Sequence, residues 1–109
     1  MRKAEIYYKG EKAGVLTQHD DGSFTYLYED RWISDPGKPS ISLTLPKSRK
    51  GYHAEYLFPF FYNMLPEGKN KEVVCRLTRI DRDDYFSLLM ITAKHDVIGA
   101  VTVKKPENP

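Results

Sequence analysis

The first quarter of the chain alternates apolar and polar residues with the period of two that is typical of half-buried β-strands. The runs AEIYYKG and KAGVLTQ, within residues 4–18, are joined through a Gly-Glu pair, which predicts a hairpin. After a turn at residues 19–22, the run SFTYLYE places Phe24, Tyr26 and Tyr28 on one face of a third strand. The pattern therefore predicts a three-stranded antiparallel meander.

Turn-forming residues interrupt this pattern in the next segment. Residues 30–40, DRWISDPGKPS, contain two Pro and one Gly and are predicted to be a loop. Residues 41–45, ISLTL, are expected to form a further short extended run. Residues 47–53 are expected to be a mobile basic loop.

From Glu55 onward apolar residues recur every three or four positions, which predicts helices. A first short helix is expected to contain Pro59 in its first turn, where the missing N–H is tolerated, and to end at Pro66. Its apolar face is predicted to consist of Tyr56, Phe60, Phe61, Met64 and Leu65.

Two further helices are predicted after Pro66. One runs from Glu67 or Lys69 to Thr78, and the other begins after Asp81 or Asp83, whose side chains can cap it. The residues expected to face inward are Val73, Val74 and Leu77, flanked by Cys75, in the first, and Phe86, Leu89, Met90 and Ala93 in the second.

The last apolar run, IGAVTVKK at residues 98–105, is predicted to be a strand. The order of strands, helices and a final strand indicates an α+β domain. We expect a small antiparallel sheet, formed by the N-terminal meander plus the C-terminal strand, with about three helices packed on it. The length of 109 residues predicts a single domain, residues 1–105, followed by a short polar tail at 106–109.

Charge and composition limit the classes of function. The net charge is +2. If Lys47, Arg49 and Lys50 all met phosphates, the salt slope of binding would be only about −2.7, so no direct nucleic-acid binding is expected. No long apolar run indicates a signal peptide or a membrane span, and the single Cys75 excludes an intramolecular disulfide or a cysteine-based zinc site. We therefore expect a cytoplasmic protein with no membrane association.

No pattern in the sequence indicates an enzyme. Neither Gly-Lys pair has the upstream Gly of a phosphate-binding loop, and Cys75 lies among apolar residues, where a thiol behaves as a small hydrophobe. His19, His53 and His95 are far apart and lack metal-ligand spacing, and the acidic cluster at residues 81–84 lacks the pattern of a calcium loop. We expect no catalytic residue, no cofactor and no metal.

Three stretches together resemble one known family. The segments at residues 28–46, 58–68 and 85–107 occur in the order, and close to the spacing, of the N-terminal subdomain of HipA serine/threonine kinases. The combination F-F-x-N-x-L-P-E followed by D-x-x-G-A is the specific part of the resemblance, although Lys94 and His95 stand where many members carry small residues. The matching residues here are Phe60, Phe61, Asn63, Leu65, Pro66, Glu67, Asp96, Gly99 and Ala100.

The resemblance implies a role beside a kinase. In HipA this subdomain precedes a kinase core that carries the nucleotide loop, the catalytic Asp and the magnesium ligands, and the present sequence contains none of these. A chain of this length is similar to HipS, the small subunit of bacterial HipBST toxin–antitoxin systems, which are linked to persistence. The resemblance thus implies an antitoxin or regulatory subunit that binds and restrains a separate HipT- or HipA-like kinase, in a complex with a HipB-like DNA-binding protein.

Such a role requires an exposed anchor for the partner. Trp32, beside the Pro/Gly loop, is the first candidate, although a lone Trp more often belongs to the core. Tyr52 and His53, together with Arg49 and Lys50, are the second, because this basic loop would reach into the nucleotide or peptide cleft of a kinase.

Three alternatives stay open. In the first alternative, the chain is the N-terminal subdomain of a longer HipA-like kinase and has a structural or dimerisation role. A small nucleic-acid binder that uses KSRKGYH is the second alternative. The third is an enzyme whose catalytic residues meet only in space.

Overall fold

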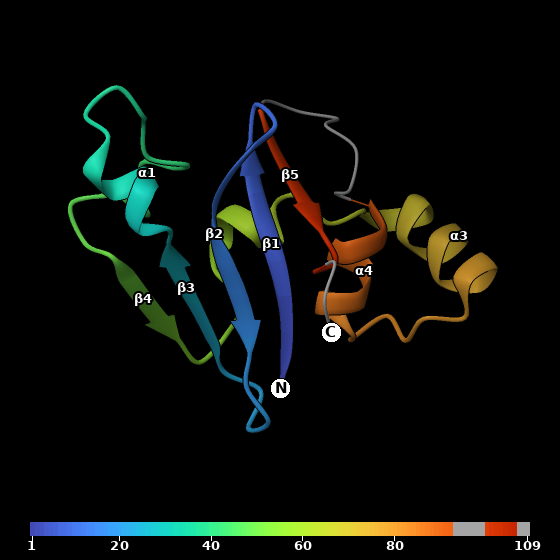
Figure 1. Ribbon diagram of the computed structural model, residues 1–109. Coiled ribbons are helices and arrows are strands. Elements are labelled where there is room, and N and C mark those ends of the chain that lie inside the picture. Colours follow the sequence, from blue (N-terminus) through green and yellow to red (C-terminus); the bar gives the residue numbers. More distant parts are fainter. Residues whose placement is uncertain (93–99, 107–109) are drawn as a thin grey trace.

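The computed structural model describes residues 1–92 and 100–106, which form a five-stranded antiparallel sheet flanked by helices (Figure 1). The strand order is β4-β3-β2-β1-β5. The strands are β1 (Arg2–Tyr8), β2 (Glu11–Gln18), β3 (Phe24–Tyr28), β4 (Gly51–Ala54) and β5 (Val101–Lys104). The helices are α1 (Asp30–Ser34), α2 (Pro59–Tyr62), α3 (Gly68–Thr78) and α4 (Tyr85–Thr92). The α+β class, the meander and the C-terminal strand are confirmed.

One face of the sheet supplies half of the core. Ala4 is paired with Leu16, Leu16 with Tyr26, and Tyr26 with Tyr52, so these four side chains form one row across β1 to β4. The first three are buried and Tyr52 is half-buried. The period of two predicted this face because every second residue of these strands must leave water.

Two neighbouring tyrosines on β3 occupy very different environments. The rings of Tyr26 and Tyr28 meet edge to face at 4.9 Å, and Tyr26 also lies 5.9 Å from Phe61 of α2. The hydroxyl of Tyr28 accepts from the N–H of Ile41 at 3.1 Å and donates to the carbonyl of Leu45. The hydroxyl of Tyr26 is buried with no hydrogen-bond partner, and burial raises its pKa.

The segment between α1 and β4 is fastened to the end of α1. The indole Nε1 of Trp32 donates to the carbonyl of Pro39 at 2.7 Å. The ammonium of Lys47 donates to the carbonyls of Trp32, Asp35 and Lys38 at 3.2, 2.5 and 2.6 Å. An ammonium has three donors, and Lys47 uses all of them on one bend of the backbone. This segment is therefore an ordered loop.

Three local predictions for this region were wrong. The predicted loop at residues 30–40 contains α1, and the predicted extended run at 41–45 is a turn in which the N–H of Leu45 donates to the carbonyl of Ser42 at 3.1 Å. This turn buries Ile41 and Leu45. The segment expected to be a mobile basic loop contains most of β4, because pairing with β3 orders it.

The first predicted helix is only the four residues of α2. Pro59 stands at its start, as expected, and the chain before it is not helical, because a proline ring disfavours helical geometry in the preceding residue. Tyr56 therefore lies outside the helix and is exposed, contrary to the prediction. Leu57 and Phe58 are buried in its place.

Helix α3 has nearly the predicted bounds but not the predicted packing. Glu67 is its N-cap residue, and no residue of the helix is buried. Val73 is exposed and Leu77 is 78% exposed, so the expectation that both face inward was wrong. Val74 and Cys75 are half-buried. Figure 1 shows the reason, because α3 projects beyond the sheet at the side of β5 and α4.

Helix α4 begins at a cap that differs from the predicted one. Asp84 accepts from the backbone N–H of Ser87 at 3.2 Å and from its hydroxyl at 2.7 Å, whereas Asp81 binds the N–H of Asp83 within the preceding turn. Phe86 and Leu89 are buried as expected, Leu88 is also buried, and Met90 is half-buried. Ala93 lies outside the described residues. Within the ranges described, no helix combines the length and apolar content needed to cross a bilayer.

The two tyrosines provide a matched pair of substitutions. Tyr26→Phe removes an unpaired buried hydroxyl, so we expect the free energy of unfolding to stay unchanged or rise by up to about 1 kcal/mol. Tyr28→Phe leaves the Ile41 N–H and the Leu45 carbonyl without their partner and should lower it by about 1–3 kcal/mol. Urea unfolding followed by circular dichroism measures both values, and equal losses for the two variants would contradict this account.

Lys47→Met tests the fastening of the loop. The only Trp in the chain is Trp32, so its fluorescence reports on this region alone. Loss of the ammonium frees three carbonyls, and we expect the emission maximum to shift to the red as water reaches the indole. Lys50→Met, which removes only an exposed ion pair with Asp30, is the control and should leave the emission unchanged. A native spectrum for Lys47→Met would refute the role given to this lysine.

Candidate partner-binding surface

The five residues that the sequence singled out for partner binding fall into two environments. Arg49, Lys50, Tyr52 and His53 gather on β4 and the two residues before it. Trp32 lies in α1, is 3% exposed, and packs edge-on against Tyr8 with ring centres 5.7 Å apart. The structure therefore places Trp32 in the core and brings the other four together at one edge of the sheet.

Strand β4 is the outermost strand on this side of the sheet (Figure 1). The N–H of Tyr28 donates to the carbonyl of Lys50 at 2.8 Å, so Lys50 and Tyr52 direct their backbone groups toward β3. The backbone N–H and C=O groups of an antiparallel strand point to alternate sides from one residue to the next. The backbone groups of Gly51 and His53 therefore point away from the sheet. No other strand of the described ranges pairs with this edge. Such an edge is a template for an added strand.

The side chains at this edge are partly fixed. The guanidinium of Arg49 lies over the ring of Tyr52 at 5.0 Å, and the hydroxyl of Tyr52 donates to the carbonyl of Pro46. Lys50 forms an exposed ion pair with Asp30 at 2.6 Å. Exposed pairs of this kind contribute little to stability, so a partner can replace Asp30 at small cost.

Two histidines that are distant in sequence meet beside β4. His19 Nε2 lies 2.7 Å from the hydroxyl of Thr25, and the same hydroxyl lies 3.1 Å from His53 Nδ1. Strand pairing sets His53 opposite Thr25, which sequence spacing did not indicate. Nowhere in the described ranges do three His, Cys, Asp or Glu residues gather closely enough to hold a metal ion. His95 lies outside the described residues.

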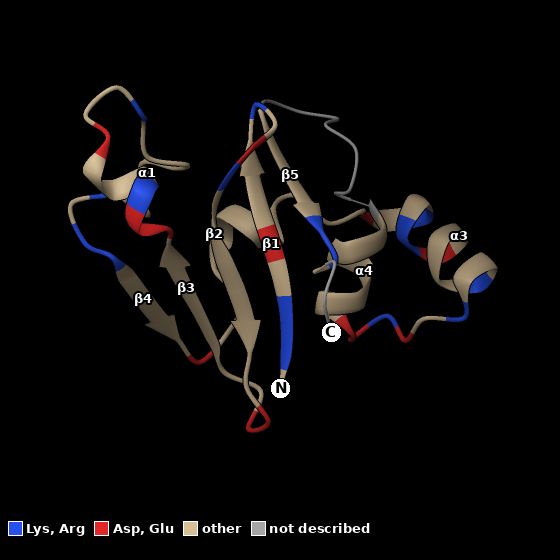
Figure 2. Ribbon diagram, viewed as in Figure 1, with Lys and Arg blue, Asp and Glu red and all other residues tan. Residues whose placement is uncertain are grey.

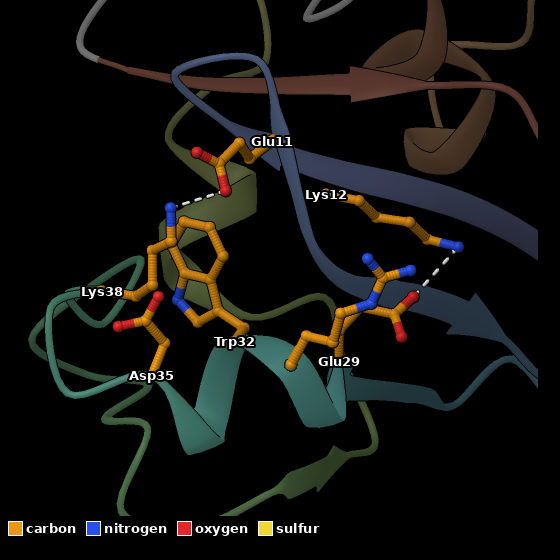
Figure 3. A pocket seen from close by; sticks show the side chains of 7 residues that line it. Glu11, Lys12, Glu29, Trp32, Asp35 and Lys38 are labelled. Atoms are coloured by element: carbon orange, nitrogen blue, oxygen red, sulfur yellow. Dashed lines mark hydrogen bonds and ion pairs between the residues drawn. The ribbon is translucent and has the colours of Figure 1, made fainter.

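A groove of about 510 Å³ opens on the other side of α1, against the β1–β2 hairpin (Figure 3). Its lining comprises Glu11, Lys12, Glu29, Arg31, Trp32, Asp35 and Lys38. Lys38 binds Glu11 at 2.6 Å and lies over the Trp32 ring at 5.3 Å. Lys12 lies 3.0 Å from both Glu5 and Glu29, and its hydrogen bonds to these two carboxylates raise its pKa.

The chemistry available to this groove is that of a polar contact surface. Four of its charged groups already form ion pairs, and its lining includes no Ser, Cys or His that could act as a nucleophile or base. No sequence pattern indicated this groove, because its residues come from the β1–β2 hairpin and from α1 with its flanking residues, and only folding brings them together.

The family-motif residues that the structure describes lie in α2, between α2 and α3, and directly before β5. Phe61 and Leu65 are buried, and Phe60 is half-buried. The N–H of Asn63 donates to the carbonyl of Pro59 at 2.9 Å, and Pro66 and Glu67 lead into α3. The carbonyl of Ala100 accepts from the N–H of Lys9 at 2.9 Å, which joins the start of β5 to the hairpin. Asp96 and Gly99 lie outside the described residues.

Comparison with known proteins gives a consistent result. The N-terminal domain of HipA toxin, a solved structure, superposes with a TM-score of 0.74 at 28% identity and covers 100% of this chain and 96% of its own. An uncharacterised protein of Haemophilus influenzae is 29% identical over 96% of this chain and 93% of its own length.

Two longer relatives come from Sinorhizobium fredii. Putative kinase Y4mE is 26% identical over 82% of this chain, and putative kinase Y4dM is 29% identical over 90% of it. The chain spans only 21% and 25% of their respective lengths. The family described as HipA N-terminal domain matches residues 4–104. The chain therefore belongs to the HipA N-terminal domain family.

Proposed function

We propose that this protein is a non-catalytic antitoxin or regulatory subunit that binds and restrains a separate HipT- or HipA-like serine/threonine kinase. The observation that carries the proposal is the occurrence of the domain in two settings. It accounts for 93% of the Haemophilus influenzae relative but for about a quarter or less of two putative kinases. A domain found both nearly alone and within putative kinases is suited to dock on a kinase core in either arrangement.

The catalytic step is assigned to the partner. Phosphoryl transfer depends on a bound nucleotide, its magnesium ions and a positioned catalytic base. The described residues supply neither a phosphate-binding loop nor a cluster of carboxylates that could hold a metal ion. We assign recognition to this chain, a role that requires an ordered surface rather than reactive groups.

We assign the kinase contact to the free edge of β4. An extended segment of the kinase would pair with the backbone groups of Gly51 and His53 and continue the sheet. Arg49, stacked on Tyr52, and Lys50 stand beside this edge and would favour an acidic segment. The sequence predicted a basic loop that reaches into a cleft of the kinase. In the contact proposed here, the backbone of β4 binds the kinase segment and the side chains favour acidic segments.

Co-expression tests the proposal as a whole. The chain should co-purify with the HipT- or HipA-like kinase core of the same genome, and its expression should relieve the growth arrest that the kinase causes. A HipB-like DNA-binding protein should enlarge the complex. Absence of a complex at micromolar concentrations, together with unrelieved arrest, would overturn the proposal.

His53→Pro tests the edge itself. Its N–H points away from β3, so proline removes one free donor without breaking the β3–β4 ladder, and Tyr52 before it is already extended. Loss of a backbone hydrogen bond worth about 1.4 kcal/mol should weaken the kinase complex about tenfold. His53→Val keeps the N–H and is the matched control. Equal affinities for the two variants, measured by isothermal titration calorimetry, would place the contact elsewhere.

The second candidate is an N-terminal subdomain of a longer HipA-like kinase, with a structural role. The two Sinorhizobium fredii relatives, of which this chain spans 21% and 25%, favour it. The gene distinguishes the two candidates. A reading frame that continues into a kinase core supports the subdomain, and a separate neighbouring frame for that core supports the regulatory subunit.

A further inference from the structure

A second groove, of about 680 Å³, lies on the side of the sheet away from β4. It runs between the start of β1, helix α4 and the residues that follow β5. Its apolar lining includes Met1, Ile80, Phe86, Met90 and Ile91. Its charged lining is Arg2, Lys3 and Lys105, and none of the described residues that line it is acidic. The groove is therefore apolar inside and basic at its rim.

The groove leaves large apolar side chains in contact with water. Phe86 is buried beneath it, whereas Met1 is 69% and Ile91 38% exposed. Figure 2 shows basic residues at the start of β1 and at the end of β5, on the same side of the molecule as α4. Exposed apolar groups bordered by charge are typical of a surface that binds another molecule.

One wall of the groove is held rigidly. The guanidinium of Arg2 binds Asp84 and the hydroxyl of Ser87, both at 2.8 Å, and lies 4.8 Å from the centre of the Phe86 ring. Burial would raise the pKa of Asp84, but the hydrogen bonds from Arg2 and Ser87 outweigh it and hold that pKa below its usual value. Asp84 lies behind the lining and neutralises Arg2, which is the lining residue of the pair.

The other two cations of the groove are Lys3 and Lys105. Lys3 and Lys105 are exposed and form no ion pair with any described residue. Lys3 lies in β1 and Lys105 directly follows β5, and these two strands are paired. A ligand that combines apolar groups with carboxylates would meet both features of the groove at once.

We infer that this groove binds an acidic, amphipathic polypeptide segment of a second protein. Its apolar side chains would cover Met90 and Ile91, and its carboxylates would meet Lys3 and Lys105. A small amphiphile is usually enclosed over most of its surface, whereas an open groove suits a segment that keeps its polar face in water. The groove and the β4 edge lie at opposite sides of the sheet, so this contact is separate from the one proposed for the kinase.

Three labelled peptides of about 14 residues, which is close to four helical turns, test the inference by fluorescence anisotropy. The first has Leu at helical spacing and Glu elsewhere, the second replaces every Glu by Lys, and the third is a scrambled acidic peptide without the apolar stripe. The full chain should bind the first at least about tenfold more tightly than the other two, a difference of about 1.4 kcal/mol. Equal binding of all three, or no binding, would overturn the inference.

Two variants assign the binding to the groove. Ile91→Glu should weaken the acidic peptide about tenfold or more, because it places a carboxylate in the apolar lining. The double variant Lys3→Glu/Lys105→Glu should reverse the preference between the acidic and basic peptides. Both positions are exposed, so these substitutions should leave the fold intact. Leu43→Glu, at a 99% exposed position outside the groove lining, is the control and should bind as the unmodified chain does.

Other occupants give different results. If the groove joins two copies of this chain, sedimentation velocity will show a dimer that Ile91→Glu dissociates, and the inference is wrong. If it binds membranes, the chain will sediment with phosphatidylglycerol vesicles and Ile91→Glu will prevent this, which also contradicts it. Binding of the kinase should be unaffected by Ile91→Glu, so failure of this inference and failure of the proposed function are distinguishable.

Discussion

The ammonium of Lys47 donates to three carbonyl oxygens, in α1 and in the loop that follows it, and the position of the candidate docking edge depends on this contact. Ile41 and Leu45 of the same loop are buried in the core, and their backbone groups form hydrogen bonds with the hydroxyl of Tyr28. These bonds fix the path of the chain from α1 to Lys50. Because Lys50 then pairs with Tyr28, they also fix where β4 begins and which of its residues keep free backbone groups.

The strands of the meander were predictable because alternation in a half-buried sheet is strict. Strand β4 was missed because GYHA follows a basic run and carries no such alternation, and its pairing with β3 is set by the loop before it. The helix periodicity located α3 well but assigned its faces wrongly. Periodicity shows which residues share a face, but it does not show whether anything covers that face, and Leu77 remains in water.

The candidate site was predictable only in part, for the same reason. Arg49, Lys50, Tyr52 and His53 were singled out because the family resemblance implied a kinase partner and these residues lie in a basic segment, and the structure places them together on one edge. The free N–H of His53 is a property of strand pairing and is not visible in the sequence. The apolar groove was missed entirely, because Lys3, Ile91 and Lys105 come from three separate elements that meet only when β5 returns beside β1.

Amide exchange at two residues of β4 tests most directly the proposed kinase contact at this edge. In the isolated chain the N–H groups of Gly51 and His53 point away from the sheet, so their exchange with deuterium should be fast. With the kinase bound, both amides should become protected while those of the exposed helix α3 keep their rates. Unchanged exchange at Gly51 and His53 in a complex that protects other residues would contradict the account.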